Sequence, residues 1–256
     1  MGRGRRRSTR GVPEIKVIGV NAARALVERR IDDVIRVYLV EERLRDFSRL
    51  LEWCAQNRRA YHLTTADELD RVASSIHHEG ICILARALAP PSLEEALGAL
   101  ARRREPELVL ALERVQNPNN LGAIVRSAAH FGVRLLVFQP ADAEVVASTA
   151  IARTAEGGLE HVGLLPVEDL APALRGMKQA GLPVIATSGH QGASIFGAPL
   201  PARAVLLLGA ERDGLSPRLK RLADATVQIP GTGHVESLNV AGACAVLLAE
   251  HWRAHR

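Results

Sequence analysis

The feature that most constrains the fold is a regular alternation of short apolar runs and amphipathic stretches over residues 107–256. The apolar runs have the length of strands, and the amphipathic stretches have the 3.6-residue period of helices. The run 204–208 is apolar throughout, as is typical of a parallel strand buried on both faces. We expect strands at 108–115, 134–139, 160–165, 182–187, 204–208 and 225–229, and helices at 121–131, 143–153, 168–179 and 238–252. This alternation predicts an α/β fold with a mostly parallel sheet covered by helices on both faces.

Composition and charge divide the rest of the chain. We expect a small α/β/α domain at 14–86. Its expected elements are a helix through Arg30 that Asn21 could cap, strands at 34–40, 60–63 and 80–84, a helix at 44–57, and a capping box formed by Thr65 and Glu68. The segment 87–106 has prolines near both ends and a charged middle, which predicts a linker that is helical in part. The second domain is then 107–256.

The positive charge of the chain is concentrated at one end. The whole chain has 33 Lys and Arg against 28 Asp and Glu, a formal net charge of +5. Residues 1–13 contain no acid and carry the arginines of a flexible basic tail, Arg3, Arg5, Arg6, Arg7 and Arg10. Such a tail is typical of an arm that binds a polyanion such as RNA. The alternative is a solvated extension in a chain whose basic residues are mostly arginine.

Cysteine, histidine and hydropathy narrow the class of protein. Cys54, Cys82 and Cys244 are odd in number and far apart, which predicts buried thiols in the reducing cytoplasm. His77, His78 and His234 lack a second pair at the spacing of a metal site, so we expect no metal. No apolar run of about 18 residues is present and no apolar core follows Arg10, so we expect neither a membrane span nor a secretory signal.

Three loops that follow expected strands could carry chemistry. The first, 116–122, leads into a helix that we expect Asn120 to cap, with Arg126 outside its apolar stripe. An arginine one turn into such a helix can hold a phosphate with two hydrogen bonds, since the helix N-terminus also attracts anions. The alternative is an ordinary capped helix with a surface arginine.

The second loop, 209–216, begins with Gly209 directly after a buried strand, which would let a ligand approach the backbone. Glu211 and Asp213 could accept hydrogen bonds there, although a simple turn with Ser216 capping the next helix explains the same residues. The third loop, 229–239, contains Gly231-Thr232-Gly233, a weak match to a dinucleotide fingerprint whose third glycine is missing. No P-loop or nucleophile-elbow string is present.

Taken together, these loops resemble the three signature motifs of the SpoU/TrmH family of RNA ribose 2′-O-methyltransferases, which belong to the SPOUT class. The matching strings are Asn117-Pro118-x-Asn120-x-Gly122-Ala123-Ile124-x-Arg126, Leu208-Gly209-Ala210-Glu211, and Ile229-Pro230 with Ser237-Leu238-Asn239. The segment 153–161 looks like an additional central segment of the family. Residues 19–22 and 78–81 are similar to the family's substrate-binding domain, which has a ribosomal-protein-like fold.

The resemblance implies a deep trefoil knot in the C-terminal domain and a homodimer whose active sites use both subunits. It implies S-adenosylmethionine as cofactor, held by Leu208, Gly209, Ala210, Ile229, Gly231 and Leu238. Catalytic and RNA-contacting roles map to Asn120, Arg126, Glu211, Ser237 and Asn239. One departure is the doubled glycine of 231–233, where many members have Met after the proline and a single Gly.

The function implied is methylation of a ribose 2′-hydroxyl in tRNA or rRNA, by a cytoplasmic enzyme that uses no metal and binds no membrane. Because a guanidinium stays protonated near neutral pH, we expect Arg126 to clamp a phosphate and stabilise developing oxyanion charge rather than to act as the base. Two alternatives stay open, namely a non-catalytic RNA-binding or ribosome-assembly factor that retains the knot, and a SPOUT enzyme that methylates a base.

Overall fold

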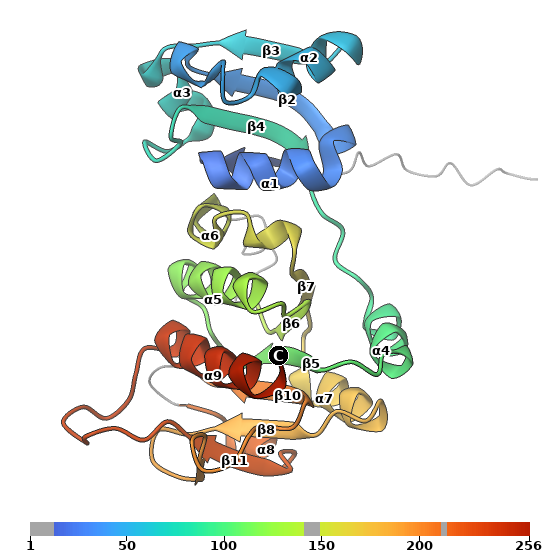
Figure 1. Cartoon of the computed structure of the whole chain (residues 1–256), viewed down its shortest axis with the longest axis vertical. Coiled ribbons are helices and arrows are strands. Elements are labelled where there is room, and N and C mark those ends of the chain that lie inside the picture. Colours follow the sequence, from blue (N-terminus) through green and yellow to red (C-terminus); the bar gives the residue numbers. More distant parts are fainter. Residues whose placement is uncertain (1–12, 141–148, 211–213) are drawn as a thin grey trace, which may run out of the picture.

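A computed structural model describes residues 13–140, 149–210 and 214–256 of the chain (Figure 1). The first part of this structure contains a four-stranded sheet in the order β1-β4-β2-β3, in which β4 runs antiparallel to β1 and β2, and β3 runs parallel to β2. Its elements are β1 (Glu14–Ile18), α1 (Val20–Arg30), β2 (Val34–Leu39), α2 (Ser48–Gln56), β3 (Ala60–Leu63), α3 (Ala66–Ala73) and β4 (Ile81–Arg86). Helices α1 and α2 bury one face of the sheet, and α3 packs on the other.

The second part contains a seven-stranded sheet in the order β7-β6-β5-β10-β8-β11-β9, and every described pair in it is parallel. Its strands are β5 (Glu107–Leu112), β6 (Leu135–Phe138), β7 (Gly163–Pro166), β8 (Val184–Thr187), β9 (Ala193–Ser194), β10 (Arg203–Leu208) and β11 (Ala225–Gln228). Its helices are α5 (Pro118–His130), α6 (Thr149–Ala155), α7 (Leu170–Gln179), α8 (Pro217–Lys220) and α9 (Val240–His255). The α/β class expected from the sequence is confirmed.

The core of the second sheet has two layers because the central strands are covered on both faces. All six residues of β5 are buried, and its five apolar residues alternate between the two layers. Helices α5 and α9 pack on the face that carries Leu110, whereas α7 and α8 pack on the face that carries Ala111. A further helix, α4 (Leu93–Arg102), lies within the segment expected to be a linker and packs its Leu97 against Gly176 of α7.

Most expected elements lie within a few residues of their observed bounds, and three local predictions are wrong. Of the helix expected at 143–153, residues 143–148 lie outside the described residues. Strand β1 was not expected, although it pairs along its whole length with β4. Asn21 does not cap α1, because the helix begins at Val20 and Gly19 occupies the N-cap position. Asn120 does not cap α5, as the next section explains. The capping box of Thr65 and Glu68 is confirmed.

The three cysteines are buried free thiols, as expected. Burial raises the pKa of the Cys244 thiol to about 12 and that of Cys82 to about 11, so both are protonated and unreactive near neutral pH. Within the part of the chain that the structure describes, no helix combines the length and apolar character needed to cross a bilayer.

Candidate active site

The expected site residues gather at one edge of the second sheet, where its parallel strands end. Leu112 of β5 and Leu208 of β10 are direct partners at the carboxyl ends of their strands. Ile229 directly follows β11, which is joined to β10 through β8. Because parallel strands end at the same edge, the loops after β5, β10 and β11 all leave the sheet there, as predicted for a ligand site in an open α/β sheet.

The N-termini of α5 and α9 meet at this edge. The Asn239 side chain caps α9, since its Oδ1 accepts hydrogen bonds from the backbone N–H of Ala241 at 2.9 Å and of Gly242 at 3.4 Å. Its Nδ2 donates to Oδ1 of Asn120 at 3.2 Å. Asn120 lies in the first turn of α5, so this bond joins the first motif to the third. Two helix N-termini side by side present free N–H groups and positive dipole ends to an anion.

The cap of α5 is Asn117 rather than Asn120. Asn117 has an extended backbone, and its Oδ1 accepts from the N–H of Asn119 at 2.9 Å. Pro118 then occupies the first helical position, where its fixed φ suits the helix and its missing N–H costs nothing. The start of α5 at Pro118 leaves the Asn120 side chain available to Asn239.

Backbone contacts join the described residues on the two sides of 211–213, after β10. Ala210 accepts a hydrogen bond from Gly214 N–H at 2.9 Å, and a Cβ added to Gly209 would lie 2.3 Å from the carbonyl carbon of Gly214. This contact gives a packing reason for glycine at 209, different from the ligand approach that the sequence suggested. Glu211 lies outside the described residues, as do the tail arginines Arg3, Arg5, Arg6, Arg7 and Arg10.

The connection from β11 to α9 is open to solvent. Ile229 is half-buried against the core, whereas residues 230–239 are exposed. Ser237 is among these exposed residues, and so is Leu238, which is 50% exposed. Among the described residues other than its two chain neighbours, none has an atom within 4 Å of a Cβ added to Gly231. His190, which follows β8, contacts Glu236 with 3.2 Å between Nε2 and Oε1 and ties the loop after β8 to this connection.

Arg126 lies further along α5, on its exposed side. The apolar stripe of Leu121, Ile124, Val125 and Ala128 is buried as expected, and the Arg126 side chain is 62% exposed. Its Nη1 lies 3.7 Å from Oε1 of Glu156, just after α6. The structure therefore joins Asn120 and Asn239 directly, and it places Arg126 beside an acid that the sequence analysis did not assign.

A second acid that the sequence analysis missed is Glu113, which follows β5 and is buried. Its carboxylate accepts a hydrogen bond from Ser216 N–H at 2.7 Å, and its own N–H donates to the carbonyl of Leu208 at 2.9 Å. It thus links the loop after β5 to the loop after β10. A lone acid at the end of an apolar strand was the available signal, because a buried charge requires a partner.

Comparison with known proteins identifies the family. Residues 107–249 match the SpoU rRNA Methylase family, and residues 16–91 match the domain described as RNA 2′-O ribose methyltransferase substrate binding. This chain belongs to the SpoU family. The expected resemblance is therefore confirmed, and it extends to both parts of the described structure.

Among relatives of this SpoU protein, an uncharacterized tRNA/rRNA methyltransferase, YfiF of Escherichia coli O157:H7, is 38% identical over 95% of this chain and 69% of its own length. The 23S rRNA (guanosine-2′-O-)-methyltransferase RlmB of Xanthomonas axonopodis pv. citri is 35% identical over 91% of this chain and 94% of its own. The crystal structure of the SpoU methyltransferase AviRb from Streptomyces viridochromogenes, in complex with AdoMet, has a TM-score of 0.76 and 25% identity, covering 98% of this chain and 94% of that one.

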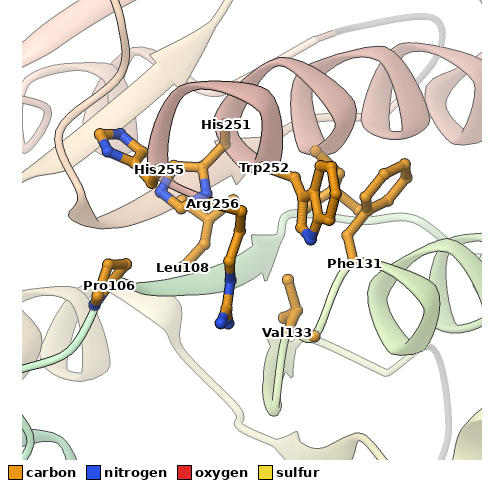
Figure 2. A pocket seen from close by; sticks show the side chains of 10 residues that line it. Pro106, Leu108, Phe131, Val133, His251, Trp252, His255 and Arg256 are labelled. Carbon is orange, nitrogen blue, oxygen red and sulfur yellow. The ribbon is translucent and has the colours of Figure 1, made fainter.

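A small cavity of the SpoU domain lies away from this site. It is about 20 Å³ and is lined by residues at the start of β5 and the end of α9, among them Pro106, His251, His255 and Arg256 (Figure 2). A space of this volume admits about one water molecule. It lies at the amino ends of the strands, opposite the candidate site.

Across residues 13–140, 149–210 and 214–256, no group of His, Cys, Asp and Glu is arranged to hold a metal ion.

Proposed function

We propose that this chain transfers the methyl group of S-adenosylmethionine to a ribose 2′-hydroxyl of RNA, and that a guanosine of 23S rRNA is the first target to test. The observation that carries the site is the hydrogen bond between Asn120 and Asn239, which brings two of the three motifs together at the carboxyl edge of the sheet. The names of the RlmB relatives support the rRNA target. The AdoMet complex of AviRb supports the cofactor.

The residues at the edge fit the proposed cofactor. Ile229 and the half-exposed Leu238 offer apolar surface for an adenine ring, and none of the described residues beyond its chain neighbours crowds the loop backbone at Gly231. The remaining cofactor contacts in this proposal are the backbone groups of Leu208, Gly209 and Ala210. When bound, S-adenosylmethionine supplies a methyl group already activated by its sulfonium, so the protein's main task is to align the hydroxyl.

The proposed RNA contacts come from the two helix N-termini and from Arg126. Arg126 would hold the phosphate next to the target ribose with two N–H groups and stabilise negative charge that develops on the hydroxyl oxygen. Ser237 and Asn239 would orient the ribose, and Asn120 would keep Asn239 in place. We assign Glu211 to the fixing of the loops rather than to proton transfer.

Three further features belong to the proposal. The chain would act as a cytoplasmic homodimer whose active sites take residues from both subunits. Residues 16–91 would bind the RNA substrate, in keeping with the domain that they match. The arginines of the tail, Arg3, Arg5, Arg6, Arg7 and Arg10, would add affinity for any RNA.

The test is transfer of labelled methyl groups into total RNA from a strain that lacks this gene, followed by mapping of the modified nucleotide. We expect label at a ribose 2′-oxygen. In the variant Arg126→Ala we expect no transfer, while calorimetric titration gives an unchanged affinity for S-adenosylmethionine. Equal loss of both would contradict the role of Arg126. A methylated base would favour a base-methylating enzyme, and absence of cofactor binding would favour a non-catalytic RNA-binding factor.

A further inference from the structure

The segment after α6 lies between the N-terminal domain and α5. In Figure 1, α6 stands between α1 above and α5 below. Glu156 is the first residue after α6, and its carboxylate contacts both sides. Oε2 accepts a hydrogen bond from Nδ2 of Asn21 in α1 at 2.7 Å, and Oε1 lies 3.7 Å from Nη1 of Arg126 in α5. One carboxylate thus contacts both the N-terminal domain, through Asn21, and the arginine of the candidate site.

The backbone adopts left-handed conformations at Glu156 and Gly157. Glu156 has a φ of 50° and Gly157 a φ of 88°, both in the left-handed region, which a residue with a side chain seldom adopts. A Cβ added to Gly157 would lie 2.8 Å from Cβ of Ala25 in α1, so the turn packs tightly on the N-terminal domain. The packing of Gly157 against α1 therefore fixes the position of the backbone from which the Glu156 side chain extends.

A bidentate ion pair fixes the same segment four residues further on. Arg30 Nε and Nη2 donate to the two carboxylate oxygens of Glu160 at 2.7 and 2.8 Å, and both side chains are at most 10% exposed. Arg30 Nη1 also donates to the carbonyl of Arg86 at 2.6 Å. Residues 156–160 are consequently anchored on the N-terminal domain at both ends, and this anchoring does not involve Arg126.

The contact between Glu156 and Arg126 contributes more to the position of the Arg126 guanidinium than to the stability of the fold. An ion pair between side chains that are 30% and 62% exposed contributes little to folding. An arginine side chain has many rotamers, however, and a carboxylate pinned by Asn21 restricts where the guanidinium lies. At 3.7 Å the approach of Nη1 to Glu156 is too long for a hydrogen bond, so this contact leaves the five donors of the guanidinium for a phosphate.

We propose that Glu156 is a positioning residue that holds Arg126 ready for the RNA phosphate and makes this position depend on the seating of the N-terminal domain through Asn21. The inference rests on the proposed function of Arg126. It predicts that the activity of the site responds to changes at Asn21, a residue of the substrate-binding domain.

The experiment compares methyl-transfer kinetics of four proteins, wild type, Glu156→Gln, Asn21→Ala and the double variant. Because small misplacements of a reacting group can cost up to a hundredfold in rate, we expect Glu156→Gln to lower kcat by about tenfold, with KM for RNA and affinity for S-adenosylmethionine nearly unchanged. Asn21→Ala should lower kcat in the same direction. The double variant should be no slower than Glu156→Gln, because both changes act through one contact. Glu156→Asp should restore part of the rate.

The matched control is Arg29→Ala, which removes a contact between the domains, from Arg29 Nε to the carbonyl of Glu160 at 3.5 Å, without touching Arg126. Because Arg29 lies in the domain proposed to bind RNA, the kcat of Arg29→Ala is compared at saturating RNA, where it should equal that of wild type. All variants should melt at the wild-type temperature. A lower KM with unchanged kcat in Glu156→Gln would overturn the proposal, because Glu156 would then only compete with RNA for Arg126. An equally slow Arg29→Ala would assign the effect to a loosened domain contact. No transfer by wild type would instead refute the proposed function itself.

Discussion

Gly122 offers a quantitative test of how closely α5 approaches α6. A Cβ added to Gly122 would lie 2.7 Å from Cβ of Thr154 and 3.0 Å from the carbonyl oxygen of Ile151, both in α6. Carbon atoms in contact are normally about 3.5–4.0 Å apart, so Gly122→Ala requires the two helices to separate by roughly 1 Å. The sequence motif thus keeps glycine here for helix packing.

Two opposing effects set the size of the change. Replacing a helical glycine by alanine gains about 0.5–1 kcal/mol through lower backbone entropy in the unfolded chain. Forcing an extra methyl group into a packed contact costs typically about 1–3 kcal/mol. Since one close atom belongs to the backbone and the other is a β-carbon, neither can rotate away, and we expect a net loss of about 1–2 kcal/mol.

The assay is differential scanning calorimetry of Gly122→Ala beside Gly98→Ala. Gly98 lies inside α4, and among the described residues its added Cβ would meet the tip of the flexible Arg102 side chain at 3.4 Å, so this matched variant isolates the helix-propensity gain. At roughly 2–4 °C per kcal/mol for a chain of this size, Gly122→Ala should lower Tm by about 2–8 °C while Gly98→Ala raises it slightly. Equal rises in both variants would refute the close approach of α5 and α6.

Three further predictions concern the tail, the domain contact and the cavity of Figure 2. Deleting residues 1–12, with their five arginines, should flatten the slope of log affinity for RNA against log salt by up to roughly 3–4, while calorimetry gives unchanged cofactor affinity. Arg30→Met leaves the buried Glu160 carboxylate unpaired and should cost roughly 3–5 kcal/mol in urea denaturation, whereas Arg30→Met with Glu160→Leu should cost far less. Burial lowers the pKa of His251, which faces His255 and Arg256, so the folded state favours the neutral ring. The unfolded chain then binds the extra proton, and stability should fall as pH drops below about 6.5, less steeply in His251→Gln; an identical pH profile in that variant would contradict the assignment.

The sequence predicted the second domain well because its signals are local. Strand-length apolar runs such as 204–208 and glycines at the ends of helices report their own structure without knowledge of the partners. Strand β1 was missed because EIKVI has only a short alternation, and its pairing with β4 depends on residues far along the chain. The cap of α5 was misplaced because Asn117 and Asn120 are both good capping residues, and Pro118 decides between them.

Prediction of the site was limited in the same way, because local motifs can be found in the sequence whereas contacts between distant residues cannot. The residues of the three motifs could be located from their resemblance to a family, whereas the contact of Asn120 with Asn239 was not visible from spacing. Glu156 lies in the segment 153–161, but the sequence assigned no role to it, because its contacts with Asn21 and Arg126 form only where the two domains meet. The trefoil knot and the dimer stay predictions from the resemblance.

The strand order of the second sheet has a consequence for how the chain folds as it is made. The N-terminal sheet is complete once β4 has emerged at Arg86, but β5, near the centre of the second sheet, needs β10 as one neighbour. At roughly 5–20 residues per second, the ribosome reaches the end of β10 at Leu208 about 5–19 s after the end of β5 at Leu112. During that interval the edge of β5 that later pairs with β10 has no partner. An unpaired apolar strand edge can pair with another chain, so the newly made protein is prone to aggregate until β10 has been added.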